Sequence, residues 1–218
     1  MKSPALPLIA PFLLFMAILE IESWLPNQHY IIYVFKTLAV GGIILWFWRS
    51  LPSMVPTDPL ASILVGIVAV VLWIGLDPCL VHYQQPLIGR DPFQMYPPAE
   101  AWMLYFFRMI GFVLCVPIME ELFWRAFLMR WLIRDDFTSV PMGTYHHLSF
   151  CLTTAFFASV HGAEWPLAVI VGILYGAWFV RTKSLGNIIL THGVTNLLLG
   201  LWCLWRNDWH FLAIVPVR

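Results

Sequence analysis

The chain has 218 residues, of which 61% are hydrophobic and only 11% are charged, and its formal net charge is zero. Soluble globular domains carry about 25% charged residues. This composition therefore excludes an ordinary soluble domain and indicates a membrane protein that crosses the bilayer several times. The balanced charge and the lack of basic runs give no indication of nucleic-acid binding.

Apolar runs recur along the whole chain, and a bilayer core needs about 20 such residues per helix. The first run follows Lys2 but has no small-x-small cleavage site after it, so we read it as a retained helix. The predicted spans are 5–22, 30–48, 60–76, 101–133, 148–161, 165–181 and 187–205, with a last short run at 209–216. We predict an all-α polytopic membrane helix bundle with about 7–8 transmembrane helices.

Two polar stretches, 77–100 and 134–147, interrupt these runs and are expected to be loops. The run 101–133 would be about 50 Å long as one straight helix. This length exceeds the hydrocarbon core, so the helix is expected to tilt, to bend at Pro117 or to protrude. No repeat or linker divides the sequence, and we predict a single membrane domain over 1–218.

The distribution of Lys and Arg predicts an orientation, because cytoplasmic loops carry an excess of both. The connection 23–29 has none. The basic residues that fall on the opposite side, if 101–133 crosses once, are Lys2, Arg49, Arg130, Arg134, Arg181 and Lys183. The N-terminus is therefore predicted to be cytoplasmic.

Ionisable residues within membrane spans are costly and by default mark a function. Glu120 and Glu121 are adjacent, so on a helix they point about 100° apart. Arg125 is four residues after Glu121, which predicts an ion pair between them and leaves Glu120 available for chemistry. The alternative is a solvated helix end. Lys36 and Arg108 are expected to snorkel or to pair inside the bundle.

Two later segments carry further polar side chains. His161 follows Phe157 by four residues, on the same helical face. His192 and Asn196 have the same spacing and also share a face, where two donors could stabilise an oxyanion. Taken alone, a histidine such as His161 in an apolar helix is more often a packed, hydrogen-bonded side chain than a catalyst. The His192–Asn196 pair, taken alone, is equally compatible with hydrogen bonding between packed membrane helices.

Taken together, the pieces "EELFWR", "FASVH" and "HGVTN" resemble the ordered motifs EExxxR, FxxxH and HxxxN of the CPBP family, the CAAX-protease and bacteriocin-processing group of intramembrane proteases. The resemblance covers 100–205, which it implies to be the catalytic core, while the three helices within 1–76 lie outside it. The surrounding sequence looks closest to bacterial CAAX prenyl protease-related proteins. That subgroup implies a multi-pass protein of the bacterial inner membrane, with exosortase or exopolysaccharide system components as partners.

The resemblance also implies a reaction, the hydrolysis of a peptide bond in a membrane-anchored protein or peptide. Glu120 is expected to be the general base that activates a water, and His161 to hold that water or to help deprotonate it. His192 and Asn196 are expected to stabilise the oxyanion. Residues expected to support these groups are Glu121, Arg125 and Phe157. No Ser or Cys belongs to the set, so no covalent nucleophile is implied.

Three alternatives remain open. Two histidines and a glutamate could bind zinc, although the HExxH arrangement is missing and Asn is a poor zinc ligand, so no cofactor is expected. A non-catalytic immunity or assembly factor would use the same polar residues only for helix packing. A proton-coupled transporter would use Glu and His as a relay, but many transporters show internal repeats. Membrane lipid is a partner on every interpretation.

Overall fold

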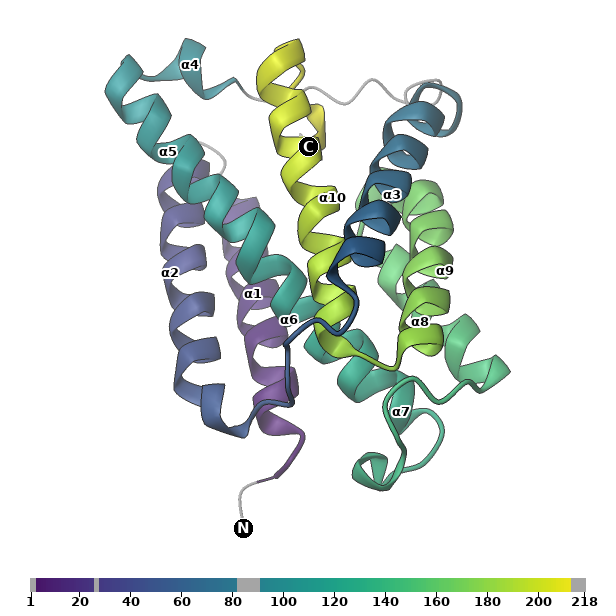
Figure 1. The fold of residues 1–218 in the computed structure, drawn as a ribbon. Coiled ribbons are helices and arrows are strands. Elements are labelled where there is room, and N and C mark those ends of the chain that lie inside the picture. Colours follow the sequence, from purple (N-terminus) through teal and green to yellow (C-terminus); the bar gives the residue numbers. More distant parts are fainter. Residues whose placement is uncertain (1–2, 26–27, 82–90, 213–218) are drawn as a thin grey trace.

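The computed structural model describes residues 3–25, 28–81 and 91–212, which form a helical bundle (Figure 1). Within these ranges six helices are long and apolar enough to cross a membrane, and His147–Ser159 is a shorter apolar helix. The predicted polytopic all-α bundle is confirmed, with the run at 148–161 forming only 13 residues of helix. Lys2, residues 82–90 of the predicted loop 77–100 and residues 213–216 of the last short run lie outside the described residues.

The helices follow the predicted apolar runs closely. The α-helices are α1 (Leu6–Trp24), α2 (His29–Phe47), α3 (Pro59–Leu80), α4 (Pro92–Met95), α5 (Pro98–Ile110), α6 (Val116–Glu121), α7 (Met129–Trp131), α8 (His147–Ser159), α9 (Trp165–Thr182) and α10 (Leu185–Arg206). Short 3₁₀ turns are η2 (Trp48–Ser50), η5 (Phe137–Ser139), η6 (Gly162–Glu164) and η7 (His210–Leu212). Helix α3 ends four residues later than the sequence indicated.

The predicted run 101–133 is one continuous helix of 34 residues, Pro98–Trp131. It contains two π-helical segments, η3 (Gly111–Cys115) and η4 (Leu122–Leu128), which flank α6. This long helix crosses the bundle obliquely between the α1–α2 pair and α10 (Figure 1). The π-helical segments are rare and occur frequently at functional sites, and here they bracket the two glutamates.

A tight turn joins α9 to α10. Lys183 adopts a left-handed conformation (φ 55°), and its N–H donates to the carbonyl of Phe179 at 2.8 Å. The Ser184 side chain then caps α10 by accepting from the N–H of Asn187. These two caps place α9 and α10 side by side, so that residues near the middle of each helix can meet.

The start of α10 is anchored to the segment 51–58. The Asn187 side-chain oxygen accepts from the backbone N–H groups of Thr57 and Asp58, at 2.8 and 3.0 Å. Gly186 lies so close to this segment that a Cβ atom there would be 2.4 Å from the carbonyl carbon of Val55. These contacts therefore fix the position of α10 along its axis relative to its neighbours.

Helix α3 packs along α10 through small residues. The hydroxyl of Thr191 donates to the carbonyl of Ser62 at 3.0 Å, and that of Thr195 contacts the carbonyl of Gly66 at 3.2 Å. Such close approach through small and hydroxyl-bearing residues is typical of membrane helix pairs. It holds the polar face of α10 toward the centre of the bundle.

The charges predicted to snorkel or pair are buried in the bundle. Lys36 forms an ion pair with Glu22 of α1 at 2.5 Å, and both side chains are almost fully buried. Arg108 donates to the carbonyl of Leu212, and its guanidinium lies over the ring of Tyr33. Pairing inside the bundle, rather than snorkelling, is therefore the outcome for both residues.

A second polar cluster lies where α3 meets the turn after α10. His210 is within 3.4 Å of the carboxylate of Asp77 and 2.5 Å of that of Asp208. Glu164 of η6 accepts from the indole N–H of Trp73 at 3.5 Å. These contacts tie η6 and η7 to the end of α3.

Candidate active site

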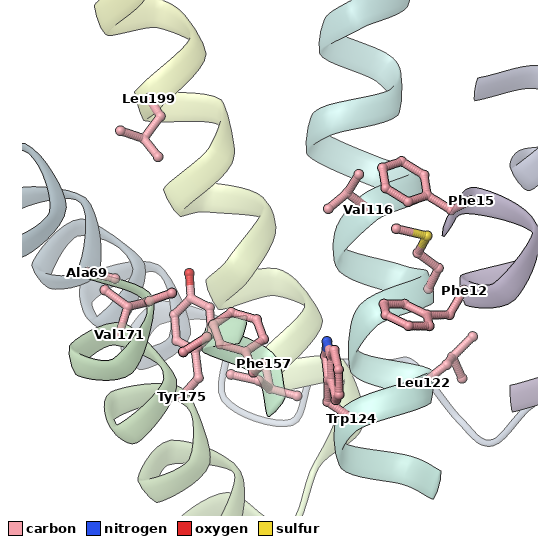
Figure 2. Packing of buried hydrophobic residues seen from close by; sticks show 14 of the residues in the cluster. Phe12, Phe15, Ala69, Val116, Leu122, Trp124, Phe157, Val171, Tyr175 and Leu199 are labelled. Atoms are coloured by element: carbon pink, nitrogen blue, oxygen red, sulfur yellow. The ribbon is translucent and has the colours of Figure 1, made fainter. Parts of the chain in front are cut away.

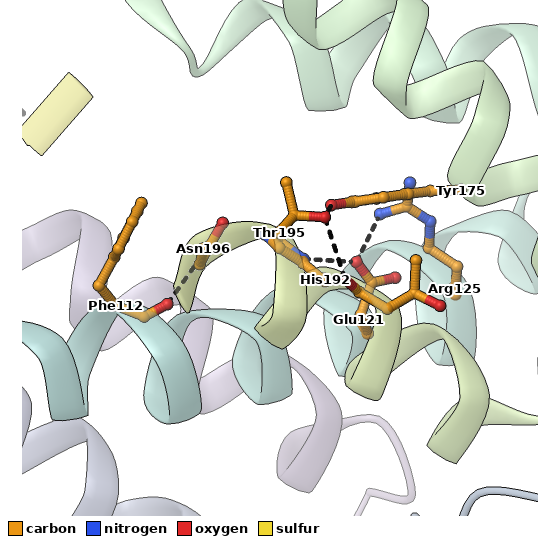
Figure 3. A network of polar contacts seen from close by, with 8 residues as sticks. Phe112, Glu121, Arg125, Tyr175, His192, Thr195 and Asn196 are labelled. Atoms are coloured by element: carbon orange, nitrogen blue, oxygen red, sulfur yellow. Dashed lines mark hydrogen bonds and ion pairs between the residues drawn. The ribbon is translucent and has the colours of Figure 1, made fainter. Parts of the chain in front are cut away.

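Glu121 lies at the centre of a buried ionic network (Figure 3). Its Oε1 accepts from Arg125 Nη1 at 3.1 Å, which confirms the ion pair predicted from the i, i+4 spacing. The same oxygen lies 2.9 Å from Nδ1 of His192, on α10. Glu121 therefore joins the helix that carries both glutamates to the helix that carries the third motif.

The guanidinium of Arg125 is held by aromatic rings as well as by its carboxylate. It lies over the ring of Phe157 at 4.8 Å and over that of Tyr175 at 5.9 Å. Phe157 itself is buried, with its ring centroid 4.5 Å from that of His161 and 6.4 Å from that of His192. Phe157 of the second motif therefore lies close to Arg125, His161 and His192.

His161 lies just beyond α8, which ends at Ser159. Its Nδ1 is 2.7 Å from the carbonyl oxygen of Phe157. A carbonyl can only accept, so this nitrogen carries the proton. The Nε2 atom of the neutral ring is then a lone-pair acceptor, which is the form needed to receive a proton or a hydrogen bond from water.

Asn196 is engaged by the π-helical segment η3. Its side-chain N–H donates to the backbone carbonyl of Phe112 at 2.7 Å. An amide has two N–H bonds, so one of them stays available to another acceptor. The contact sets the position of α10 against the long helix at one turn beyond His192.

Glu120 is buried, with 7% of its surface exposed, and its Oε2 has no hydrogen-bond partner among the described residues. Its electrostatic neighbours are His192, Glu121, Arg125 and the indole N–H of Trp124. A buried carboxylate oxygen without a partner is costly. Such an oxygen can accept a hydrogen bond from a water or a substrate group.

Two aromatic residues that belong to none of the three motifs also lie in the site. The ring of Tyr175 on α9 lies 5.1 Å from that of His192, and its hydroxyl donates to Thr195 at 2.8 Å. Trp73 on α3 lies 5.9 Å from His161. Both are aromatic residues in apolar runs, so the sequence offers no signal that separates them from ordinary core residues.

Within the described ranges, no group of three or more His, Cys, Asp and Glu side chains is arranged to hold a metal ion. The Nδ1 atoms of His161 and His192 are directed at a carbonyl and a carboxylate, respectively. Each of these two nitrogens therefore has a hydrogen-bond partner within the protein.

Residues 101–198 match a protein family described as type II CAAX prenyl endopeptidase Rce1-like. The matched range contains all three motifs noted in the sequence, and the resemblance to CAAX proteases is confirmed. The match supports a membrane-embedded protease with a peptide or protein substrate. It gives no support for partners in exosortase or exopolysaccharide systems. Neither the curated proteins nor the solved structures compared with the chain include a match.

Proposed function

Because residues 101–198 match the Rce1-like CAAX prenyl endopeptidase family, we propose that the chain is an intramembrane endopeptidase that uses Glu120 and His161 to activate a water. The substrate is a membrane-anchored protein or peptide. The observation that carries the proposal is the buried, unpartnered Glu120 oxygen beside the Glu121–Arg125–His192 network.

In the proposed reaction, water attacks the scissile carbonyl carbon and the Glu120 carboxylate takes its proton. The Nε2 lone pair of His161 accepts from the same water and orients it. The new C–O bond produces a tetrahedral oxyanion. The proton held by Glu120 then passes to the leaving nitrogen as the C–N bond breaks, which returns the carboxylate to its starting state.

Oxyanion stabilisation is assigned to His192 and Asn196, and the observed contacts define what each must do. Asn196 keeps one N–H after donating to Phe112. His192 presents Nδ1 to Glu121, so donation from Nε2 requires the doubly protonated ring. The Glu121 carboxylate is placed to support that charge, while Arg125 holds the carboxylate from the other side.

The proposed location is a bacterial inner membrane, with the N-terminus in the cytoplasm. Support comes from the six membrane-length helices and from the basic residues on one side of the predicted spans. Cleavage would then take place inside the bundle, where Glu120 is shielded from bulk water.

The proposal is tested with purified protein in liposomes and two fluorogenic probes, a farnesylated CAAX peptide and an unlipidated peptide fused to a membrane anchor. Wild type should cleave at least one probe. Glu120→Gln and His161→Ala should lower kcat/KM by about 10²–10⁴-fold, the usual contribution of a general base. The matched control is Glu100→Gln, which neutralises an exposed glutamate on α5 and should retain the wild-type rate. Equal cleavage by Glu120→Gln, or no cleavage of either probe by wild type, would contradict the proposal.

A further inference from the structure

Trp124 is a buried tryptophan one turn after Glu120. Its side chain is 3% exposed, and its indole N–H has no hydrogen-bond partner among the described residues. Figure 2 shows it on the face of the long helix that is turned toward Phe157. An indole N–H can only donate, and a buried donor without an acceptor is unfavourable. If the site needed only apolar packing, a phenylalanine would fill it without that cost.

Three aromatic contacts hold the indole in one orientation. The ring of Phe12 lies 5.0 Å away, that of Phe123 4.6 Å and that of Phe157 6.2 Å, all edge to face. These rings come from α1, from η4 itself and from α8. Edge-to-face contacts on several sides restrict rotation of the ring, so the direction of the N–H is fixed by the fold.

The candidate acceptor for the indole N–H of Trp124 is the carboxylate of Glu120. The two residues are four apart on one helix, which places their side chains on the same face. The indole N–H contributes to the electrostatic environment of the carboxylate, and Oε2 of Glu120 is itself buried without a partner. A donor without an acceptor and an acceptor without a donor are therefore one turn apart on the same helix. Catalytic hydrogen bonds of this kind are often long before substrate binds and shorten in the reacting complex.

We propose that Trp124 is a positioning residue whose indole N–H donates to the Glu120 carboxylate and turns the opposite oxygen toward the reacting water. The inference rests on the proposed function, because it assigns a helper to the proposed general base. The donor stabilises the ionised carboxylate, the form that accepts a proton from water. The motif EExxxR does not assign this role, since Trp124 occupies one of its variable positions.

The test compares Trp124→Phe with Trp178→Phe in the farnesylated CAAX peptide assay, or with the anchored peptide if that is the probe cleaved. Both substitutions remove a buried indole N–H that has no partner among the described residues, but Trp178 lies on α9 outside the predicted site. We expect Trp124→Phe to lower kcat by about 10-fold or more, the effect of losing one hydrogen bond to a charged group, with KM unchanged. The acid limb of its rate–pH profile should move to higher pH. Trp178→Phe should match wild type in all three respects.

Each outcome bears on the inference. A wild-type kcat and pH profile in Trp124→Phe overturns it, and so does a lower kcat with the acid limb unmoved, which indicates packing alone. An equal shift in Trp178→Phe also overturns it. The position of the limb does not depend on how much enzyme is folded, so partial misfolding does not obscure the result. If wild type cleaves neither probe, the proposed function itself fails, which is distinct from an active enzyme indifferent to Trp124.

Discussion

Replacing Arg125 by Leu should destabilise the protein strongly, because it leaves the buried carboxylate of Glu121 without its guanidinium. Arg125 is 1% exposed, its contact to Oε1 is 3.1 Å, and its guanidinium lies 4.8 Å from the ring centroid of Phe157. Removing one partner of a buried pair costs about 3–5 kcal/mol, and the lost cation–π contact adds roughly 0.5–2 kcal/mol. His192 stays beside the carboxylate and offsets part of this, so we expect a loss of about 3–4 kcal/mol. That corresponds to a 10²–10³-fold change, roughly, in the unfolding equilibrium.

Unfolding in detergent micelles by added SDS, followed by tryptophan fluorescence, measures this change in free energy. The double variant Glu121→Leu/Arg125→Leu should be more stable than the single variant, because no uncompensated charge is left. The control is Arg206→Leu, which removes an exposed guanidinium over two tryptophan rings and should cost no more than about 1 kcal/mol. A loss under about 1 kcal/mol in Arg125→Leu, or a double variant less stable than the single, would refute the reasoning from a buried ion pair.

Three further predictions concern backbone packing, pH and metals. Gly186→Ala should destabilise the protein by about 1–3 kcal/mol, since its new Cβ would lie 2.4 Å from the backbone of Val55. Gly42→Ala should not destabilise it, because no atom lies within 4 Å of the new Cβ there. The same SDS titration compares the two variants. Burial lowers the pKa of His210, but hydrogen bonds to Asp77 and Asp208 outweigh it and raise the pKa above the ordinary 6.5. The protonated ring should therefore stabilise the fold fully below pH 6.5, and this stabilisation should disappear as pH rises through the raised pKa. The difference in unfolding free energy between wild type and His210→Asn should then decrease as pH is raised from roughly 5.5 to 9. A difference that stays constant contradicts this. Cleavage of the peptide probe should be unchanged by EDTA, and a loss restored by zinc would replace the direct glutamate mechanism with a metal-dependent one.

Local spacing predicted one contact within a helix, between Glu121 and Arg125. The Glu121–Arg125 pair follows from a separation of four residues, and the apolar runs locate the helices to within a few positions. Contacts between helices were not predictable in this way. His192 meets Glu121 across 71 residues, and the caps and small-residue packing that set the height of α10 decide that meeting.

Two features of the structure are not predictable from the sequence, and each has a physical reason. Glu22 ends the first apolar run, where it looks like a boundary residue, yet it is buried against Lys36 because α1 and α2 pack as an antiparallel pair. The π-helical segments are also not predictable in this way, because an apolar run contains no signal that separates a π-helical turn from a regular one of 3.6 residues. The predicted roles of Glu120, His161, His192 and Asn196 remain proposals that the cleavage assay must test.

The two π-helical segments make this part of the chain sensitive to insertions and deletions. Each segment accommodates backbone that a regular α-helix would not contain. The same residues wound as a regular α-helix would turn everything after them further around the helix axis, because an α-helix has fewer residues per turn than a π-helix. Both glutamates would then face a different neighbour without any change in their identity. Among functional homologues, a chain that lacks the π-helical turn at Gly111–Cys115 should therefore also lack one residue there.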